Sequence, residues 1–448
     1  MSTVPAPARG LLRATLTLVA GGAAAQAAPL LLGPVLTRLV SPAELGTFHL
    51  FSAVAANLAV VACARYEFAL PMITDDDEAQ GLRALCLRVL AGVTLVAALA
   101  GAGWAAVRGQ SFPLWLPAAV AALGALSLAT LWATRTQRFT VLSASRVVQY
   151  GGGALGQVVL ASLGAGVHGL IGASVAAAAA SAALLRLPLR LRMPERRVGG
   201  AGHAGGDAAP GLDGGWRALA RRHRDFPLLN TPHAFLGALQ DTAAIALVTA
   251  WLGPMAAGFW GLSLRYLKAP ATLVGGAVSQ ALYPKLAAGT APAGQAGTAP
   301  RVTAEARAAV RRVMAALAAM AAPLVLALWA GAPWAFSHLF GPAWHDAGLL
   351  ARALAVYVGV HFVAAPLAVV TLAWGAQAWA LRLAVVGQVA FVGALAAGLA
   401  AGGLATAGWA VSAAMTLYFG YYFWSLATWP LTPTEAAADG GDARRGTP

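Results

Sequence analysis

The sequence predicts an all-α, polytopic membrane protein with about twelve transmembrane helices, and three observations lead to this fold class. The chain of 448 residues is 59% hydrophobic and only 10% charged, whereas a soluble domain is usually about 45–50% apolar and about 25% charged. The apolar residues form runs of roughly 20, the length that crosses a bilayer as a helix. Basic residues gather in every second loop between these runs. A soluble fold of this size could not cover its surface with so few charges.

The expected spans follow one another with short loops and one long polar interruption. Approximately, they cover residues 12–35, 46–66, 82–106, 112–134, 144–164, 167–187, 227–251, 256–281, 308–330, 348–372, 376–400 and 404–428.

The basic residues predict the orientation of these spans. With a cytoplasmic N-terminus, the loops after even-numbered spans face inward, and they hold most of the arginines, whereas the outward loops hold only Arg38 and Arg108. Cytoplasmic loops carry an excess of Lys and Arg. We therefore expect a multi-pass membrane protein with both termini in the cytoplasm. The same placement accounts for the net charge of +14 without a nucleic-acid partner.

The long polar interruption predicts two domains. Residues 187–226 are rich in Arg and Gly, the composition of a flexible cytoplasmic linker. They separate an N-terminal six-helix lobe, residues 1–186, from a C-terminal six-helix lobe, residues 227–430. Residues 431–448 form a polar tail that we expect to be disordered.

A weak internal repeat relates the two lobes. The residues Thr37, Pro42, Gly46 and Leu50 recur 212 positions later as Thr249, Pro254, Gly258 and Leu262. Both copies carry the same Pro-x-x-x-Gly, placed at a turn between spans. An even number of spans in each lobe makes the repeat parallel, a layout found in two-lobed transporters.

Two short features have structural explanations. Cys63 and Cys86 show no metal-ligand spacing and no disulfide framework, so we expect small, buried apolar residues. The acidic run Asp75–Glu78 is expected to cap the third helix, where carboxylates complement the helix dipole.

Ionisable residues inside the spans are the strongest functional candidates, because charge within a bilayer is costly and usually functional. Arg265 and Lys268 share one face of the eighth span near its middle, and Arg352 enters the tenth span. These three cations could bind an anionic group. Asp241 lies mid-span and could be a counter-ion of this pair or a coupling group, and His361 could titrate or hydrogen-bond a neighbour.

Amides supply the polar groups of the first lobe. Gln26, Asn57 and Gln157 lie within its spans, where no charge falls near the midplane. Such side chains can contact a polar ligand or another helix, and helix packing is the simpler explanation. Charge within the spans is therefore concentrated in the second lobe.

Several ordered segments of the chain are similar to a known family. GPVLTRLVSPAELGTF, RYEFALPMITDDDEA, DFPLLNTPHAFLGAL, FWGLSLRYLKAPATLVGGAVSQALYPK and LFGPAWHDAG resemble bacterial polysaccharide-export (oligosaccharide) flippases. That family belongs to the superfamily that also contains MATE exporters and the lipid II flippase. The resemblance implies two lobes around a central cavity, alternating access, and export of undecaprenyl-diphosphate-linked oligosaccharide from the cytoplasmic to the outer leaflet of the bacterial inner membrane. For such a substrate we expect Arg265, Lys268 and Arg352 of the second lobe to bind the diphosphate, and the sugars to lie partly against Gln26, Asn57 and Gln157 of the first. It also implies that the protein acts together with a polysaccharide polymerase and chain-length machinery and needs no cofactor. Coupling to H⁺ or to Na⁺ would both be compatible with the resemblance.

Two other functions compete with this hypothesis. An ion-coupled small-molecule or multidrug antiporter would share the fold and Asp241, but it would have less need for the cationic pair. A membrane glycosyltransferase or polymerase usually needs a polar catalytic domain or a long outer loop. The outward loops here are short, and the 187–226 linker lacks the paired carboxylates of sugar chemistry. We therefore do not expect an enzyme.

Overall fold

The computed structural model describes residues 27–187, 215–288 and 302–431. Throughout these ranges the chain is helical, as predicted, and a single bridge between Val302 and Leu431 is the only β-pairing described. Eight helices there are long and apolar enough to cross a membrane. Gln26, most of the 187–226 linker and nearly all of the 431–448 tail lie outside the described residues.

The chain divides into two compact units. One consists of Met1–Val40 and Phe51–Thr242, and the other of Ser41–Leu50 and Ala243–Pro448. The division passes through two helices, α2 (Pro42–Val60) and α9 (Thr231–Ala288), so the start of α2 belongs to the second unit and the start of α9 to the first. The units are described separately below.

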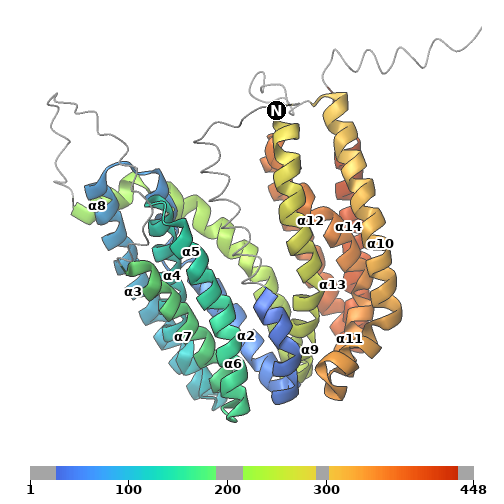
Figure 1. Ribbon diagram of the computed structural model, residues 1–448, viewed down its shortest axis with the longest axis horizontal. Helices are drawn as coiled ribbons and strands as arrows, with labels where there is room; N and C mark the ends of the chain where they lie inside the picture. The colour runs from blue at the N-terminus through green and yellow to red at the C-terminus, as the bar shows by residue number, and fades with distance from the viewer. Residues whose placement is uncertain (1–26, 188–214, 289–301, 432–448) are drawn as a thin grey trace, which may run out of the picture. The chain divides into compact units, whose positions relative to one another are not determined.

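The first unit is a layer of roughly antiparallel helices (Figure 1). Its helices are α3 (Asp76–Arg108), α4 (Leu116–Arg135), α5 (Phe139–Arg146), α6 (Gly153–Ser162), α7 (Gly166–Arg186) and α8 (Gly215–Arg222). A π-helical turn, η3 (Val147–Gly152), joins α5 to α6, so together they form the predicted fifth span. The α4 and α7 faces meet over buried leucine and alanine side chains.

The predicted bounds of the second and third spans were wrong by about six residues. Helix α2 ends at Val60, because Ala64 and Arg65 take positive φ angles and turn the chain into a short 3₁₀ helix, η1 (Tyr66–Met72). Helix α3 begins early because the Asp75 carboxylate accepts a hydrogen bond from the backbone N–H of Asp77 at 3.0 Å, which confirms the predicted cap. The prediction that Cys63 and Cys86 are buried and free is also confirmed.

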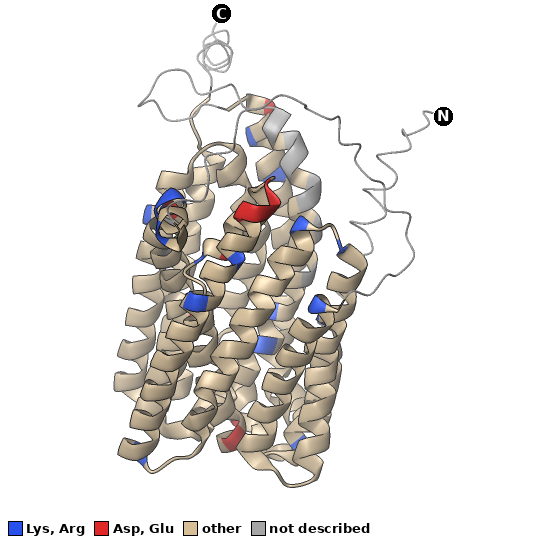
Figure 2. Ribbon diagram, turned by 90° about the vertical axis from the view of Figure 1, so that its left-hand side faces the viewer, with Lys and Arg blue, Asp and Glu red and all other residues tan. Residues whose placement is uncertain are grey.

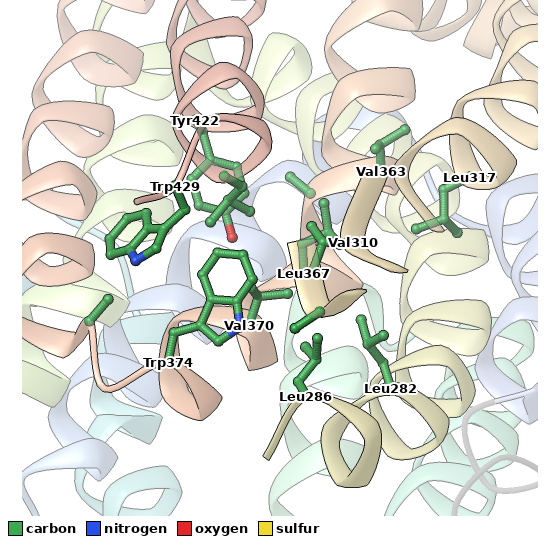
Figure 3. Packing of buried hydrophobic residues seen from close by; sticks show 14 of the residues in the cluster. Leu282, Leu286, Val310, Leu317, Val363, Leu367, Val370, Trp374, Tyr422 and Trp429 are labelled. Carbon is green, nitrogen blue, oxygen red and sulfur yellow. The ribbon is translucent and has the colours of Figure 1, made fainter. Parts of the chain in front are cut away.

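The second unit is built from α9 and five later helices. These are α10 (Ala304–Phe340), α11 (His345–Ala353), α12 (Ala355–Ala373), α13 (Gln377–Gly402) and α14 (Leu404–Ala427). The predicted tenth span is split at Leu354 into α11 and α12. Figure 3 shows one end of the core, where Trp374 and Trp429 pack with ring centroids 5.6 Å apart beside Tyr422 and Val370.

Helix α9 joins the predicted seventh and eighth spans through a sharp break rather than a loop. Gly253 interrupts the helix with φ 84° and ψ 177°, a conformation open mainly to glycine. Pro254 follows, and its fixed φ suits the first turn of the helix that resumes there.

The two copies of the Pro-x-x-x-Gly motif contact each other within the second unit. A β-carbon on Gly46 would overlap the Pro254 carbonyl oxygen, and one on Gly258 would overlap the Pro42 carbonyl oxygen. The contact is reciprocal, as expected when two repeated elements face one another. Only residues without a side chain let the two helix backbones approach so closely.

We expect Gly258→Ala to destabilise the protein, because the added methyl group meets backbone, which cannot rotate away. Forced overpacking costs roughly 1–3 kcal/mol, which should lower the melting temperature of the purified protein in detergent by several degrees. Gly393→Ala is the matched control: a β-carbon there meets open space, and alanine favours the helix by about 1 kcal/mol. Equal melting temperatures for the two variants would contradict the contact.

Candidate functional site

A single stripe of α9 combines small residues with the predicted cations. Gly258, Gly261, Arg265 and Lys268 are spaced by three, four and three positions, which places them on one face of a helix. The start of α2 packs against the glycine part of this stripe. Arg265 and Lys268 continue the same face and are half-buried.

The opposite face of α9 fixes how the helix is rotated. The Ser263 hydroxyl donates to the Ala347 carbonyl at 2.9 Å. Three aromatic contacts lie on the same side: Phe259 with Trp344, Trp260 with Phe391, and Tyr266 with Phe340, the last with centroids 4.7 Å apart. With this face packed against α10, α11 and α13, the cationic stripe is turned away from the core of the unit.

The break at Gly253 fixes how far along the resumed helix both cations lie. Arg265 and Lys268 stand 12 and 15 residues beyond Gly253, or about 18 and 22 Å along the helix axis at ~1.5 Å per residue. With Gly253 at the membrane surface, both lie inside a hydrocarbon core about 30 Å thick. In Figure 2 most basic residues lie toward helix ends and few lie along the middle of a helix.

His49 joins this site, and sequence reasoning missed it. Its ring lies against Gly261, where an added β-carbon would overlap the imidazole ring. Its Nε2 is buried without a hydrogen-bond partner among the described residues. The internal repeat could have predicted this contact. His49 and Gly261 are 212 positions apart, which is the offset between the two Pro-x-x-x-Gly motifs that face each other.

Arg352 and His361 belong to the same unit. Arg352 ends α11, is half-buried, and has an Nε atom that finds no hydrogen-bond acceptor in the described part of the chain. His361 lies on α12 between two rings, with centroids 5.8 Å from Tyr357 and 6.1 Å from Phe419. Their roles in diphosphate binding and coupling stay predictions.

The remaining predicted residues lie in the first unit. Asp241 is exposed on the first part of α9, whereas Arg265 and Lys268 belong to the second unit, so its counter-ion role stays a prediction. The Asn57 amide donates to the Thr242 hydroxyl at 3.3 Å, and the Gln157 amide donates to the Ser174 hydroxyl at 2.8 Å. Both amides are buried between helices, as the packing explanation expects, and sugar contact stays a prediction.

Glu67 is a second residue that sequence reasoning did not single out. It lies in η1, its side chain is only 2% exposed, and Ser127 on α4 donates to its Oε1 at 3.3 Å. Its Oε2 has no partner within the described ranges. Burial raises the pKa of the Glu67 carboxyl, and the Arg65 charge offsets this only in part. The first unit therefore contains a buried acid able to hold a proton.

No protein-family model and no curated protein matches the sequence. Solved structures do match the fold. A MOP superfamily transporter from Pyrococcus furiosus matches with a TM-score of 0.55 and 13% identity, over 93% of this chain and 95% of that one. A single-residue variant of the Vibrio cholerae MATE transporter VcmN matches with a TM-score of 0.52 and 13% identity, over 96% and 97%. A MATE protein in complex with MaD3S matches with a TM-score of 0.50 and 13% identity, over 93% and 96%.

These likenesses define the fold. The chain is a multi-pass membrane protein with the fold of the MATE/MOP superfamily transporters.

Replacing Glu67 by Gln should change how stability depends on pH. A carboxyl whose pKa is raised by folding favours the folded state while it is protonated, and that contribution is lost as pH rises above the unfolded pKa. The melting temperature of Glu67→Gln relative to the unmodified protein should therefore increase between about pH 4.3 and neutral pH.

The control for this experiment is Glu305→Gln, which removes an exposed carboxylate from the first turn of α10. The melting temperature of Glu305→Gln relative to the unmodified protein should stay level or fall as pH rises, because a negative charge in the first turn stabilises the helix. If the melting temperature of Glu67→Gln relative to the unmodified protein does not rise with pH, the raised pKa of the Glu67 carboxyl is contradicted.

Proposed function

We propose that this protein is a flippase that moves undecaprenyl-diphosphate-linked oligosaccharide from the cytoplasmic to the outer leaflet of the bacterial inner membrane, for surface polysaccharide biosynthesis. The observation that carries the proposal is Arg265, a half-buried guanidinium at membrane depth that forms no ion pair among the described residues. A cation placed there without a carboxylate partner favours an anionic ligand.

The stripe offers chemistry that suits a diphosphate. A guanidinium binds phosphate oxygens through two parallel hydrogen bonds, and an ammonium acts as a compact point charge. Arg265 and Lys268 provide one of each on neighbouring turns, and the buried Nε2 of His49 adds a third polar atom. These groups would replace the hydration that the diphosphate loses within the bilayer, while the polyprenyl chain stays in lipid.

The resemblance of the ordered segments to oligosaccharide flippases adds the sugar and the carrier to this proposal. Alternating access of two lobes, 1–186 and 227–430, would expose the site to each leaflet in turn. One structural neighbour, from Pyrococcus furiosus, is described as a MOP superfamily transporter whose pocket has reverse polarity, suggesting a different function. A cationic site in this chain would likewise differ in polarity from a pocket that binds cationic substrates.

Coupling and partners follow as parts of the same proposal. Asp241 and His361 are the candidates for H⁺ or Na⁺ coupling, and Asp241 could also neutralise the stripe when no substrate is bound. A polymerase and chain-length machinery would take the exported repeat unit on the outer side. The cytoplasmic position of both termini rests on the placement of the arginines.

The test in cells is leaflet-resolved labelling of lipid-linked oligosaccharide with and without the gene. Loss of the protein should leave the glycolipid on the cytoplasmic side and abolish surface polymer. An unchanged glycolipid distribution with increased sensitivity to cationic dyes would contradict the proposal and favour the multidrug antiporter.

Charge-preserving substitutions should separate ligand binding from packing. We expect Arg265→Lys and Lys268→Arg to retain most export, and Arg265→Ala and Lys268→Ala to lose about tenfold or more, because a charge-assisted hydrogen bond contributes about 1.5–3 kcal/mol. The measurement is surface polymer at matched protein levels. Equal losses from the conservative and alanine variants would indicate packing instead.

A further inference from the structure

A small pocket in the first unit brings three arginines together at one end of its helices. It has a volume of about 80 Å³ and is lined by Arg83, Arg138 and Arg186 with Trp132, Leu128 and Leu185. The arginines come from α3, from the turn before α5 and from the end of α7. None of them belongs to the candidate transport site.

Two of the three guanidinium groups are held in place. The Arg138 guanidinium donates to the carbonyl oxygens of Leu185 and Leu187 at 2.9 and 2.6 Å, where the end of a helix leaves carbonyls without partners. The Arg83 guanidinium lies 5.0 Å from the Trp132 ring centroid, within the range of a cation–π contact. Arg186 is exposed in the last turn of α7.

No carboxylate among the described residues lines this pocket. Asp76, which lies at the same end of α3, is paired with Arg135 at 2.7 Å. Three positive charges around one small space repel each other unless an anion lies between them. A volume of about 80 Å³ exceeds the roughly 10–15 Å³ that a cavity needs to hold one water, so it leaves room for a tetrahedral phosphate group.

We propose that this pocket binds the phosphate of an anionic phospholipid headgroup in the leaflet that these helix ends face. Two observations favour a lipid over a soluble anion. Arg135 and Arg186 are the last residues of candidate membrane spans, so the pocket lies at the level of the headgroups. The rest of its lining is apolar, as expected where acyl chains begin. Basic pockets between transmembrane helices are known to bind lipid headgroups. This site is independent of the transport proposal.

The test is native mass spectrometry of the full-length protein, purified in neutral detergent and supplied with equal amounts of phosphatidylglycerol and phosphatidylcholine. The unmodified protein should retain phosphatidylglycerol preferentially, and Arg83→Gln should lower that retention about tenfold. Arg88→Gln is the matched control: it removes an exposed charge from the same helix outside the pocket and should leave retention unchanged. Arg186→Gln serves as the second variant if Arg83→Gln does not fold.

Three results would overturn the proposal. One is equal retention of the two lipids by the unmodified protein. Another is an equal loss from Arg83→Gln and Arg88→Gln, which would reflect general surface charge. The third is displacement of phosphatidylglycerol by millimolar inorganic phosphate, which would identify a site for the free anion.

Discussion

The contact between Gly46 and Gly258 is the constraint on which the rest of the site depends. Because neither residue has a side chain, the start of α2 and the resumed part of α9 approach backbone to backbone. That approach brings His49 against Gly261. Arg265 and Lys268 are the next residues along the same face of α9. The packing of two small residues therefore positions the charges that define the candidate site.

Much of the fold was predictable from the sequence, because lipid imposes a simple rule. Every span must be a long apolar helix, so composition and the loop arginines predicted an all-α membrane protein. The errors occurred where backbone conformation decides: Arg65 takes a positive φ and ends α2 early, and Gly253 breaks α9 without a loop. Such conformations depend on tertiary packing that hydropathy does not encode.

The candidate site was predictable only in part. Depth and charge identified Arg265 and Lys268, but Glu67 and the three-arginine pocket depend on which helices pack together. Glu67 stood in a loop by hydropathy, and its burial depends on the packing of η1 against α3 and α4. The arginines of the pocket were predicted as orientation signals, and their convergence on one space is a tertiary property. His49 could have been found, since the repeat offset pairs it with Gly261.

The measurement that tests the transport proposal most directly uses purified protein in liposomes. Polyprenyl-diphosphate-linked oligosaccharide would be placed in one leaflet, and its appearance in the other followed by accessibility to a membrane-impermeant lectin or glycosidase. The account predicts movement that depends on the protein and is lost with Arg265→Ala. Movement no faster than in empty liposomes, under proton and sodium gradients of either sign, would contradict it.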